Sequence, residues 1–158
     1  MPRVCVMTPL GPLILLEKSA AIVSLDWGRA SDAEPSPLLI EAKNQLEAYF
    51  HGRLKVFDLP LAPPSTAFQT AVWTLMERIA HGQTRTYGEM ALDLKSGPRA
   101  VGNAGGRNPI PIFIPCHRVI GAGRRMCGYS GGAGIATKQA LLLLEDPEKR
   151  GWFERSKS

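Results

Sequence analysis

The chain has 158 residues, of which 44% are hydrophobic and 21% charged, and its formal net charge is +5. This composition fits a folded chain with a buried core in one or two small domains. It argues against a membrane span, because no apolar run approaches the roughly 18 residues that a transmembrane helix needs, and the first residues are too briefly apolar for a signal peptide. We therefore expect a cytoplasmic protein.

Two short apolar runs near the start predict a pair of strands. Residues 13–16 and 21–27 are rich in aliphatic side chains, and the polar segment 17–19 separates them as a hairpin turn would. Residues 28–37 are polar and contain prolines, which predicts a loop, and apolar side chains at helical spacing then predict a helix over 38–50. Residues 56–59 are expected to return as a strand. Residues 1–62 would thus form a small α/β domain without a chemical motif.

A proline-containing segment, residues 60–65, predicts a linker, and a helix should follow it. Thr66 is a suitable N-cap, and Gln69 three residues later would complete a capping box. The helix would end at Gly82. Its apolar stripe consists of Phe68, Val72, Leu75, Met76 and Ile79.

Two further short helices are predicted between residues 87 and 106. The first follows Thr86 and would turn the apolar side chains at 90, 91 and 94 inward, and the second begins at Pro98 or Arg99. The second contains few bulky side chains, and its glycines lower helix stability, so close approach to a flat or bulky partner would explain them. A short helix, a turn and a small-residue helix form the outline of a helix-turn-helix.

The rest of the chain is expected to be an extended segment, a loop and a last helix. Residues 108–120 are punctuated by prolines, and residues 121–134 are rich in glycine. Thr137 is predicted to cap a helix that ends at Glu145. Residues 66–155 would form the second domain.

Charge is distributed unevenly between these two parts. Residues 1–65 carry six basic and seven acidic side chains, a net charge of −1, whereas residues 66–158 carry thirteen basic and seven acidic ones, a net charge of +6. No acidic residue lies between Asp93 and Glu145. This stretch is either a solvated basic face or a surface that contacts phosphates.

The chain contains three cysteines, Cys5, Cys116 and Cys127. Their odd number and irregular spacing argue against a disulfide framework. No CxxC pair is present and the three histidines are scattered, so we expect no structural zinc and no other metal site.

Cys116 and His117 are adjacent in the run Ile114–Val119. A free thiol has a pKa of about 8.5 and becomes nucleophilic as its thiolate, so a nearby imidazole could activate it. However, neighbouring side chains on an extended segment point to opposite faces, and a free cysteine is often a buried structural residue. The pair alone leaves both possibilities open.

Five blocks in order resemble the O6-alkylguanine-DNA alkyltransferases, a DNA repair family. They are Arg99–Gly102, Arg107–Ile112, Ile114–Val119, Gly128–Gly132 and the helix from Lys138 to Glu145. The resemblance covers residues 66–150 and, more loosely, the N-terminal part. It implies an α+β fold, in which a small ribonuclease H-like α/β unit precedes a mainly helical domain with a winged-helix-like helix-turn-helix.

The resemblance also implies the chemistry. Cys116 would accept the alkyl group from O6-alkylguanine, or from O4-alkylthymine, in a single displacement that inactivates the protein and needs no cofactor. His117 would take the thiol proton through a water, and Glu145 would orient the imidazole. Asn108 would hold the turn before the active-site segment. Without the resemblance, Glu145 would be interpreted as a solvated carboxylate at a helix end.

By the same resemblance, the partner is double-stranded DNA and the protein acts as a monomer that flips the damaged base out of the helix. Arg99 would fill the vacated space, and Tyr87, otherwise an ordinary core tyrosine, would help to rotate the nucleotide. Small residues would let the recognition helix sit in the minor groove. The DNA-binding set is Tyr87, Arg99, Ala100, Gly102 and Arg107, and Ala104 and Gly105 are further small residues of that helix.

The substrate pocket implied by the resemblance would be lined by Tyr87, Pro111, Val119, Tyr129, Ser130 and Gly131. Gly105 and Gly131 would leave room for alkyl groups larger than methyl.

Three other functions would each account for part of the sequence. A non-catalytic lesion sensor keeps the fold, but in such relatives the reactive cysteine is replaced, and Cys116 is present. A cysteine hydrolase would use Cys116, His117 and Glu145, but it needs an oxyanion hole and leaves the basic stretch unexplained. A winged-helix transcription regulator explains the charge but not the segment from Asn108 to His117.

Overall fold

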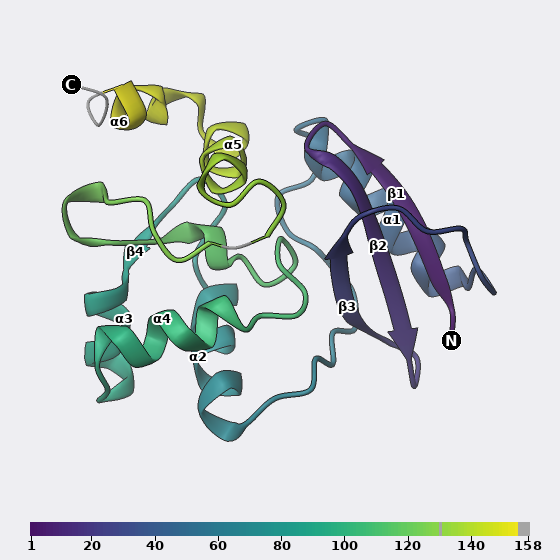
Figure 1. Ribbon diagram of the computed structural model, residues 1–158, viewed down its shortest axis with the longest axis horizontal. Helices are drawn as coiled ribbons and strands as arrows, with labels where there is room; N and C mark the ends of the chain where they lie inside the picture. Colours follow the sequence, from purple (N-terminus) through teal and green to yellow (C-terminus); the bar gives the residue numbers. More distant parts are fainter. Residues whose placement is uncertain (130, 155–158) are drawn as a thin grey trace. The chain divides into compact units, whose positions relative to one another are not determined.

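The computed structural model describes residues 1–129 and 131–154, and its contacts divide the chain into two units, Met1–Pro64 and Ser65–Ser158. In the first unit, three antiparallel strands form a sheet in the order β1-β2-β3 (Figure 1). They are β1 (Arg3–Thr8), β2 (Gly11–Lys18) and β3 (Ala21–Trp27). The hairpin predicted from residues 13–27 is confirmed, and β1 adds a strand that was not predicted.

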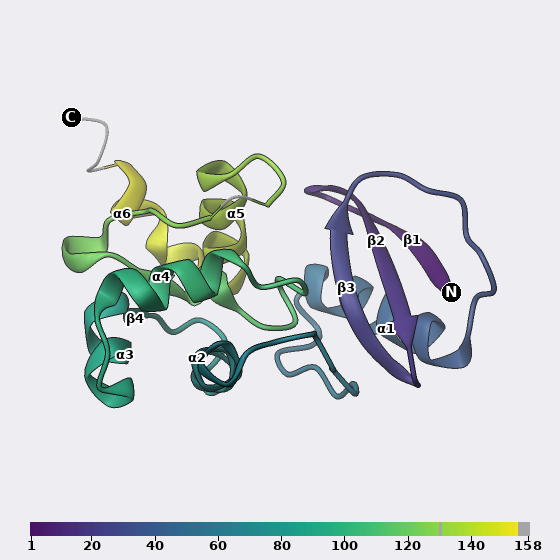
Figure 2. The same cartoon turned by 60° about the horizontal axis from the view of Figure 1, so that its bottom comes forward.

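One helix covers the sheet of the first unit. α1 (Pro37–Phe50) begins after Ser36, whose side chain accepts a hydrogen bond from the backbone N–H of Leu39, and it packs on β1 and β2 (Figure 2). Alternate residues of the strands face this helix, as Val4 pairs with Leu15 and Val6 with Leu13, all buried.

The prediction of a strand at residues 56–59 is wrong. The segment makes no ladder, and the nearest pairing is a single bridge between Leu61 and Ile22. Pro60, Pro63 and Pro64 lack a backbone N–H, so the pairing cannot extend to either side of this bridge.

The second unit begins with α2 (Ala67–Glu77), and the predicted capping box is confirmed, since the side chains and backbone groups of Thr66 and Gln69 bond reciprocally. The helix ends at Glu77 rather than near Gly82, and Phe68 is exposed rather than buried. The buried face instead includes Trp73, whose Nε1 donates to the carbonyl of Ala104 at 2.9 Å. The apolar stripe is therefore rotated toward the helix that carries Ala104.

The helix-turn-helix is confirmed. β4 (Arg85–Thr86) leads into α3 (Tyr87–Leu94), which Thr86 caps by accepting from the backbone N–H of Glu89. The left-handed Lys95 ends α3, and α4 (Pro98–Gly106) packs on both α3 and α2. β4 pairs in parallel with β5 (Val119–Ile120), which joins the segment after α4 to the helical hairpin.

From residue 107 onward, the described chain consists mainly of turns and short helices. It contains η1 (Cys116–Arg118), η2 (Ala122–Arg124), α5 (Ile135–Glu145), η3 (Pro147–Lys149) and α6 (Arg150–Glu154). α5 begins three residues earlier than predicted, with Gly134 rather than Thr137 as N-cap. Thr137 lies in its first turn and accepts from the backbone N–H of Ala133, so it stabilises the helix start from inside. Across residues 1–129 and 131–154, no helix is both long and apolar enough to cross a bilayer.

Candidate active site

A tight turn after α4 positions the candidate nucleophile. Asn108 Nδ2 donates to the carbonyl of Ile114 at 2.8 Å, and its Oδ1 accepts from the backbone N–H of Ile110 at 3.0 Å. Ile112 in the middle of the turn has a φ of 75°, which is strained for a β-branched residue. Asn108 thus closes the turn that brings the chain back to Cys116, the position that the family resemblance implied for it.

Cys116 and His117 lie in the single 3₁₀ turn η1, not on an extended segment as predicted. In a 3₁₀ turn successive side chains are about 120° apart rather than 180° apart. The side chains of Cys116 and His117 therefore do not point to opposite faces, as they would on an extended segment. η1 packs against α2 and α5, and Cys116 and His117 are buried.

A buried carboxylate joins the histidine and the arginine of η1. Glu145, at the end of α5, approaches His117 Nε2 with Oε2 at 2.6 Å. Arg118 holds the same carboxylate with two bonds, from Nε to Oε1 at 2.8 Å and from Nη2 to Oε2 at 2.9 Å. Glu145 is therefore not the solvated carboxylate that the sequence alone would have suggested.

The same cluster ties α5 and η1 to the end of α2. Glu145 Oε1 accepts from the backbone N–H of Gly82 at 3.2 Å, and Arg118 Nη1 donates to the carbonyl of Ile79 at 2.7 Å. The buried Lys149 adds a bond from Nζ to the carbonyl of Gly82 at 2.6 Å. Gly82 and η1, both distant from Glu145 in the sequence, thus fix the position of its carboxylate.

The charges in this cluster set the protonation states. Burial alone would raise the pKa of Glu145, but its hydrogen bonds and ion pairs with His117 and Arg118 hold that pKa far below its ordinary value. Burial lowers the pKa of His117 below 6.5, against the opposing effect of Glu145. At neutral pH the site therefore contains an ionised carboxylate and a neutral imidazole.

Which imidazole nitrogen carries the proton follows from the hydrogen bond to Glu145. A carboxylate accepts, so Nε2 donates, and in the neutral ring Nδ1 is then the basic nitrogen. Nδ1 is buried and has no hydrogen-bonding partner within the described part of the chain. The ring can therefore accept one proton at Nδ1.

Cys116 is a thiol in the resting site. Burial raises its pKa, whereas a hydrogen bond with the Asn108 side chain and the charge of Lys138 act in the opposite direction. The thiolate consequently forms only when a base removes the proton.

Lys138 was expected on a basic surface, and this was wrong, because its side chain is fully buried. Its Nζ donates to the carbonyls of Val119 at 2.5 Å and Cys127 at 2.6 Å, and lies 3.4 Å from the Tyr87 hydroxyl. Burial lowers its pKa to about 8. Among residues 1–129 and 131–154 no carboxylate forms an ion pair with it. It is a buried cation beside a potential thiolate.

Tyr87 joins the helix-turn-helix to this centre. Its hydroxyl donates to the carbonyl of Cys127 at 3.1 Å, and its ring lies 5.6 Å from Lys138 Nζ. A Cβ added to Gly102 would lie 3.9 Å from the ring, and one added to Gly128 would clash with the hydroxyl. The first residue of α3 is therefore packed between α4 and the loop before α5.

The predicted DNA-binding residues are divided over two faces of α4. Arg99, Ala100 and Arg107 are exposed, whereas Gly102 is half-buried against Tyr87. Ala104 and Gly105 face α2 rather than a groove, and a Cβ on Gly105 would lie 2.9 Å from Met76 Cε. Their small size therefore serves helix packing, and the space beside Gly105 is occupied by Met76 and does not enlarge the pocket.

A surface hollow of about 590 Å³ lies beside α4. It brings together Gly102, Arg107 and Tyr129, with Asn103, Gly106, Gly128 and Ile135 as the other lining residues. Pro111 and Val119 are buried and do not line it, and Gly131 is half-buried. The predicted pocket residue Ser130 lies outside the described residues.

The buried hydroxyl of Tyr129 has no hydrogen-bonding partner within the described residues. Burial raises the pKa of this hydroxyl, as it does for Tyr87, so both tyrosines are neutral donors at neutral pH. Within the described ranges no group of three or more His, Cys, Asp or Glu side chains could hold a metal ion.

Sequence reasoning missed Arg118 and Lys138 as parts of the centre. Both were counted with the surface charges, and only their position within the blocks Ile114–Val119 and Lys138–Glu145 connects them with the site. Nothing in the sequence indicated that Lys149 or Gly82 belongs to the centre.

Two family models match the chain in consecutive parts. Residues 4–63 match the ribonuclease-like domain of 6-O-methylguanine DNA methyltransferase, and residues 67–147 match its DNA binding domain. The chain is 45% identical over 148 residues to a methylated-DNA–protein-cysteine methyltransferase of Methanosarcina acetivorans, covering 87% of this chain and 94% of the relative. It is 43% identical over 151 residues to the constitutive protein of that name from Bacillus subtilis, covering 87% and 91%.

Solved structures agree with these matches. The crystal structure of the O6-methylguanine methyltransferase of Mycobacterium tuberculosis has a TM-score of 0.81 at 39% identity, and covers 92% of this chain and 93% of its own. A second structure from that organism, a complex with DNA, has a TM-score of 0.81 at 42% identity, and covers 90% and 91%.

Proposed function

The chain belongs to the 6-O-methylguanine DNA methyltransferase family, and on this premise we propose that it repairs DNA by moving the alkyl group of O6-alkylguanine onto Cys116. The proposal extends to O4-alkylthymine. The observation that carries it is the hydrogen-bonded pair of His117 and Glu145 beside Cys116, in the same unit as a helix-turn-helix. DNA is the partner, and we propose that a monomer acts on it from the cytoplasm.

Activation begins with a proton transfer. The Cys116 proton passes to Nδ1 of His117, directly or through a water, and Glu145 with Arg118 stabilises the imidazolium that forms. The low pKa of Glu145 keeps its carboxylate ionised throughout, so it stabilises the positive charge and does not take the proton itself.

The thiolate then attacks the alkyl carbon. The Sγ–C bond forms as the C–O6 bond breaks, and the guanine leaves with the bonding electron pair and regains a proton. The product is a thioether on Cys116, which has no route back to the thiol, so each molecule reacts once.

Lys138 supports the charged state of the nucleophile. A buried cation without a carboxylate partner favours an anion nearby, and the positive charge of Lys138 lowers the pKa of Cys116. Its bonds to the carbonyls of Val119 and Cys127 hold the ammonium group in place. We infer that it stabilises the thiolate once His117 has taken the proton.

The damaged base must leave the duplex to reach a buried thiol, at a cost of a few kcal/mol. Arg99 on the exposed face of α4 is suited to occupy the space in the base stack, and Ala100 allows close approach to the minor groove. Tyr87, at the start of α3, is placed to guide the nucleotide toward the centre.

The alternatives have less support. A lesion sensor would not need the Glu145–His117 pair next to a cysteine, and a hydrolase would not need a helix-turn-helix. The family assignment favours alkyl transfer over both and over a transcription regulator.

The test is the mass of the intact protein after mixing with a duplex that carries one O6-methylguanine. One methyl group per molecule in place of a hydrogen is expected for the wild type and for Cys127→Ser, and none for Cys116→Ser. Binding of the damaged duplex without a mass change would instead support the sensor.

A further inference from the structure

A tight hairpin at residues 121–125 presents two arginines that the proposed mechanism does not use. Gly121 donates its backbone N–H to the carbonyl of Arg125 at 2.8 Å, and the residues between them form the tip. Gly123 and Arg124 both have left-handed backbone conformations, with φ of 67° and 63°. Glycine adopts this conformation freely, but arginine does not, so Arg124 is an unusual residue for the tip of a turn.

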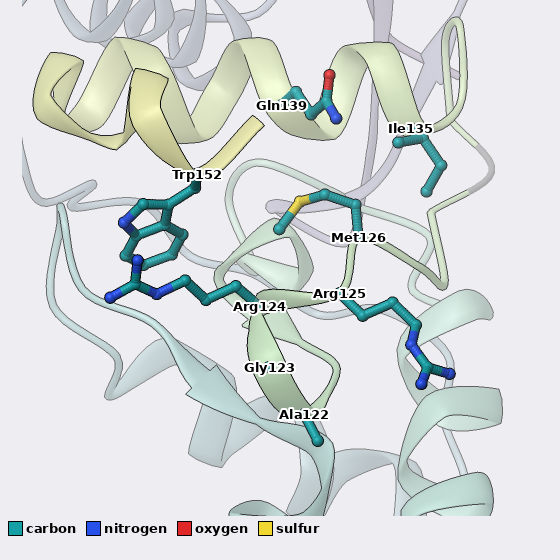
Figure 3. A pocket seen from close by; sticks show the side chains of 8 residues that line it. All are labelled: Ala122, Gly123, Arg124, Arg125, Met126, Ile135, Gln139 and Trp152. Carbon is teal, nitrogen blue, oxygen red and sulfur yellow. The ribbon is translucent and has the colours of Figure 1, made fainter. Parts of the chain in front are cut away.

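The side chain of Arg124 is held by an aromatic residue from α6. Its guanidinium carbon lies 4.4 Å from the ring centroid of Trp152, and Lys149 Nζ lies 5.1 Å from the same ring. Figure 3 shows the guanidinium of Arg124 beside the indole, whereas Arg125 extends in the other direction from the hairpin. Stacking on the indole orients the planar donor group and leaves its edge for a ligand.

The hairpin, α5 and α6 enclose a groove of about 830 Å³. Besides the two arginines and Trp152, its lining includes Gln139 and Met126, and none of the lining residues is acidic. Both arginines are exposed, and no carboxylate occurs in the sequence between residues 94 and 144. Within the part of the chain that the structure describes, neither arginine forms an ion pair. The groove therefore offers two planar, permanently charged donor groups, the chemistry that best fits phosphate oxygens.

We propose that this groove binds the phosphate backbone of the DNA duplex, beyond the base pairs that α4 contacts. Arg124 and Arg125 each donate to a phosphate, and Trp152 is a positioning residue that fixes Arg124. This inference rests on the proposed function, because it takes duplex DNA as the substrate. The contacts carry no sequence information, as suits a protein that acts on lesions in any context.

The salt dependence of binding tests the proposal. Each lost phosphate contact should reduce the slope of log affinity against log salt by about 0.9, so Arg124→Ala/Arg125→Ala should reduce it by about 2 on an undamaged duplex. Arg125→Ala alone should reduce it by about 1, and because that guanidinium has no aromatic partner, this variant tests the proposal without disturbing the contact to α6. Trp152→Leu keeps both charges and should weaken binding with a smaller change in slope.

Arg53→Ala is the matched control, since Arg53 is an exposed arginine of the first unit, and its slope should equal that of the wild type. Wild-type slopes for Arg125→Ala and the double variant would overturn the inference. Alkyl transfer by the wild type, measured with the same duplex carrying O6-methylguanine and with the free base, separates this outcome from failure of the proposed function. If neither substrate alkylates the wild type, the proposed function fails; if both do and the slopes are unchanged, only the groove assignment fails.

Discussion

The second unit contains two groups of cations with opposite environments. The buried cations, Arg118, Lys138 and Lys149, are at most 6% exposed, and each donates to backbone carbonyls or carboxylates of distant segments. The surface arginines, Arg99, Arg107, Arg124 and Arg125, are exposed. The acid-free stretch between Asp93 and Glu145 thus supplies both Arg118 and Lys138 to the candidate centre and the four exposed arginines suited to DNA, whereas Lys149 follows this stretch.

The comparison predicts that removing a buried cation costs much more stability than removing a surface one. Arg118→Met leaves the Glu145 carboxylate buried with only part of its compensation and should lower the free energy of unfolding by about 3–5 kcal/mol. Arg99→Met should change it by less than about 0.5 kcal/mol. Urea denaturation of both variants checks this, and equal losses would remove the distinction between the two groups.

A second buried cation should affect the chemistry more than the binding. Lys138→Met removes the positive charge that favours the Cys116 thiolate, and we expect the single-turnover transfer rate to fall about 10- to 100-fold, equivalent to about 1.4–2.8 kcal/mol. The exposed Lys95→Met is the control and should retain the wild-type rate. An unchanged rate in folded Lys138→Met protein would show that this buried charge is only structural.

Two glycines, one beside the buried centre and one in the surface hairpin, allow the same comparison for the backbone. Gly128 and Gly123 both have positive φ, but an added Cβ meets the Tyr87 hydroxyl at Gly128 and nothing within 4 Å at Gly123. Both alanine variants should lose about 1–2 kcal/mol of stability through the backbone. Gly128→Ala should lose about 1 kcal/mol more, because its added Cβ displaces the Tyr87 hydroxyl. Thermal melts of the pair measure the difference, and equal losses would mean that Tyr87 moves aside freely.

Alkyl transfer, which depends on the buried groups, and DNA binding, which depends on the surface arginines, should differ in their pH dependence. Transfer should slow below pH 6.5 as His117, whose pKa is lowered, becomes protonated, and it should slow again above about 8 as Lys138 loses its charge. Binding of an undamaged duplex should stay nearly constant between about pH 6 and 9, because guanidinium groups remain charged. Lys138→Met should lose the alkaline decrease, and its persistence would assign that decrease to another group.

The folded-state pKa of His117 also has a consequence for stability. Because it lies below the unfolded value of 6.5, the unfolded chain binds more protons in acid, so stability decreases as the pH falls through this range. The low pKa of Glu145 has the same sign and extends the loss below pH 4.5.

Much of the fold was predictable because its signals are local. The capping box of Thr66 and Gln69, the cap at Thr86 and the break before Pro98 each involve a few neighbouring residues. The features that were not predicted occur where a segment can adopt more than one local conformation. The segment 56–59 has strand-like side chains, but the prolines that follow it prevent a ladder. The Cys116–His117 pair adopts a 3₁₀ turn where an extended segment was expected.

By itself the sequence determined the candidate nucleophile, its neighbouring base, the order of the motifs and the excess of positive charge. Only the tertiary structure decided which cations are buried, since Arg118 and Glu145 are 27 residues apart and Lys138 and Tyr87 are 51 apart. It also decided that Ala104 and Gly105 pack on α2 instead of facing DNA. The physical reason is that a capping bond is satisfied within one turn, whereas a buried charge is stable only where distant segments bring it enough acceptors.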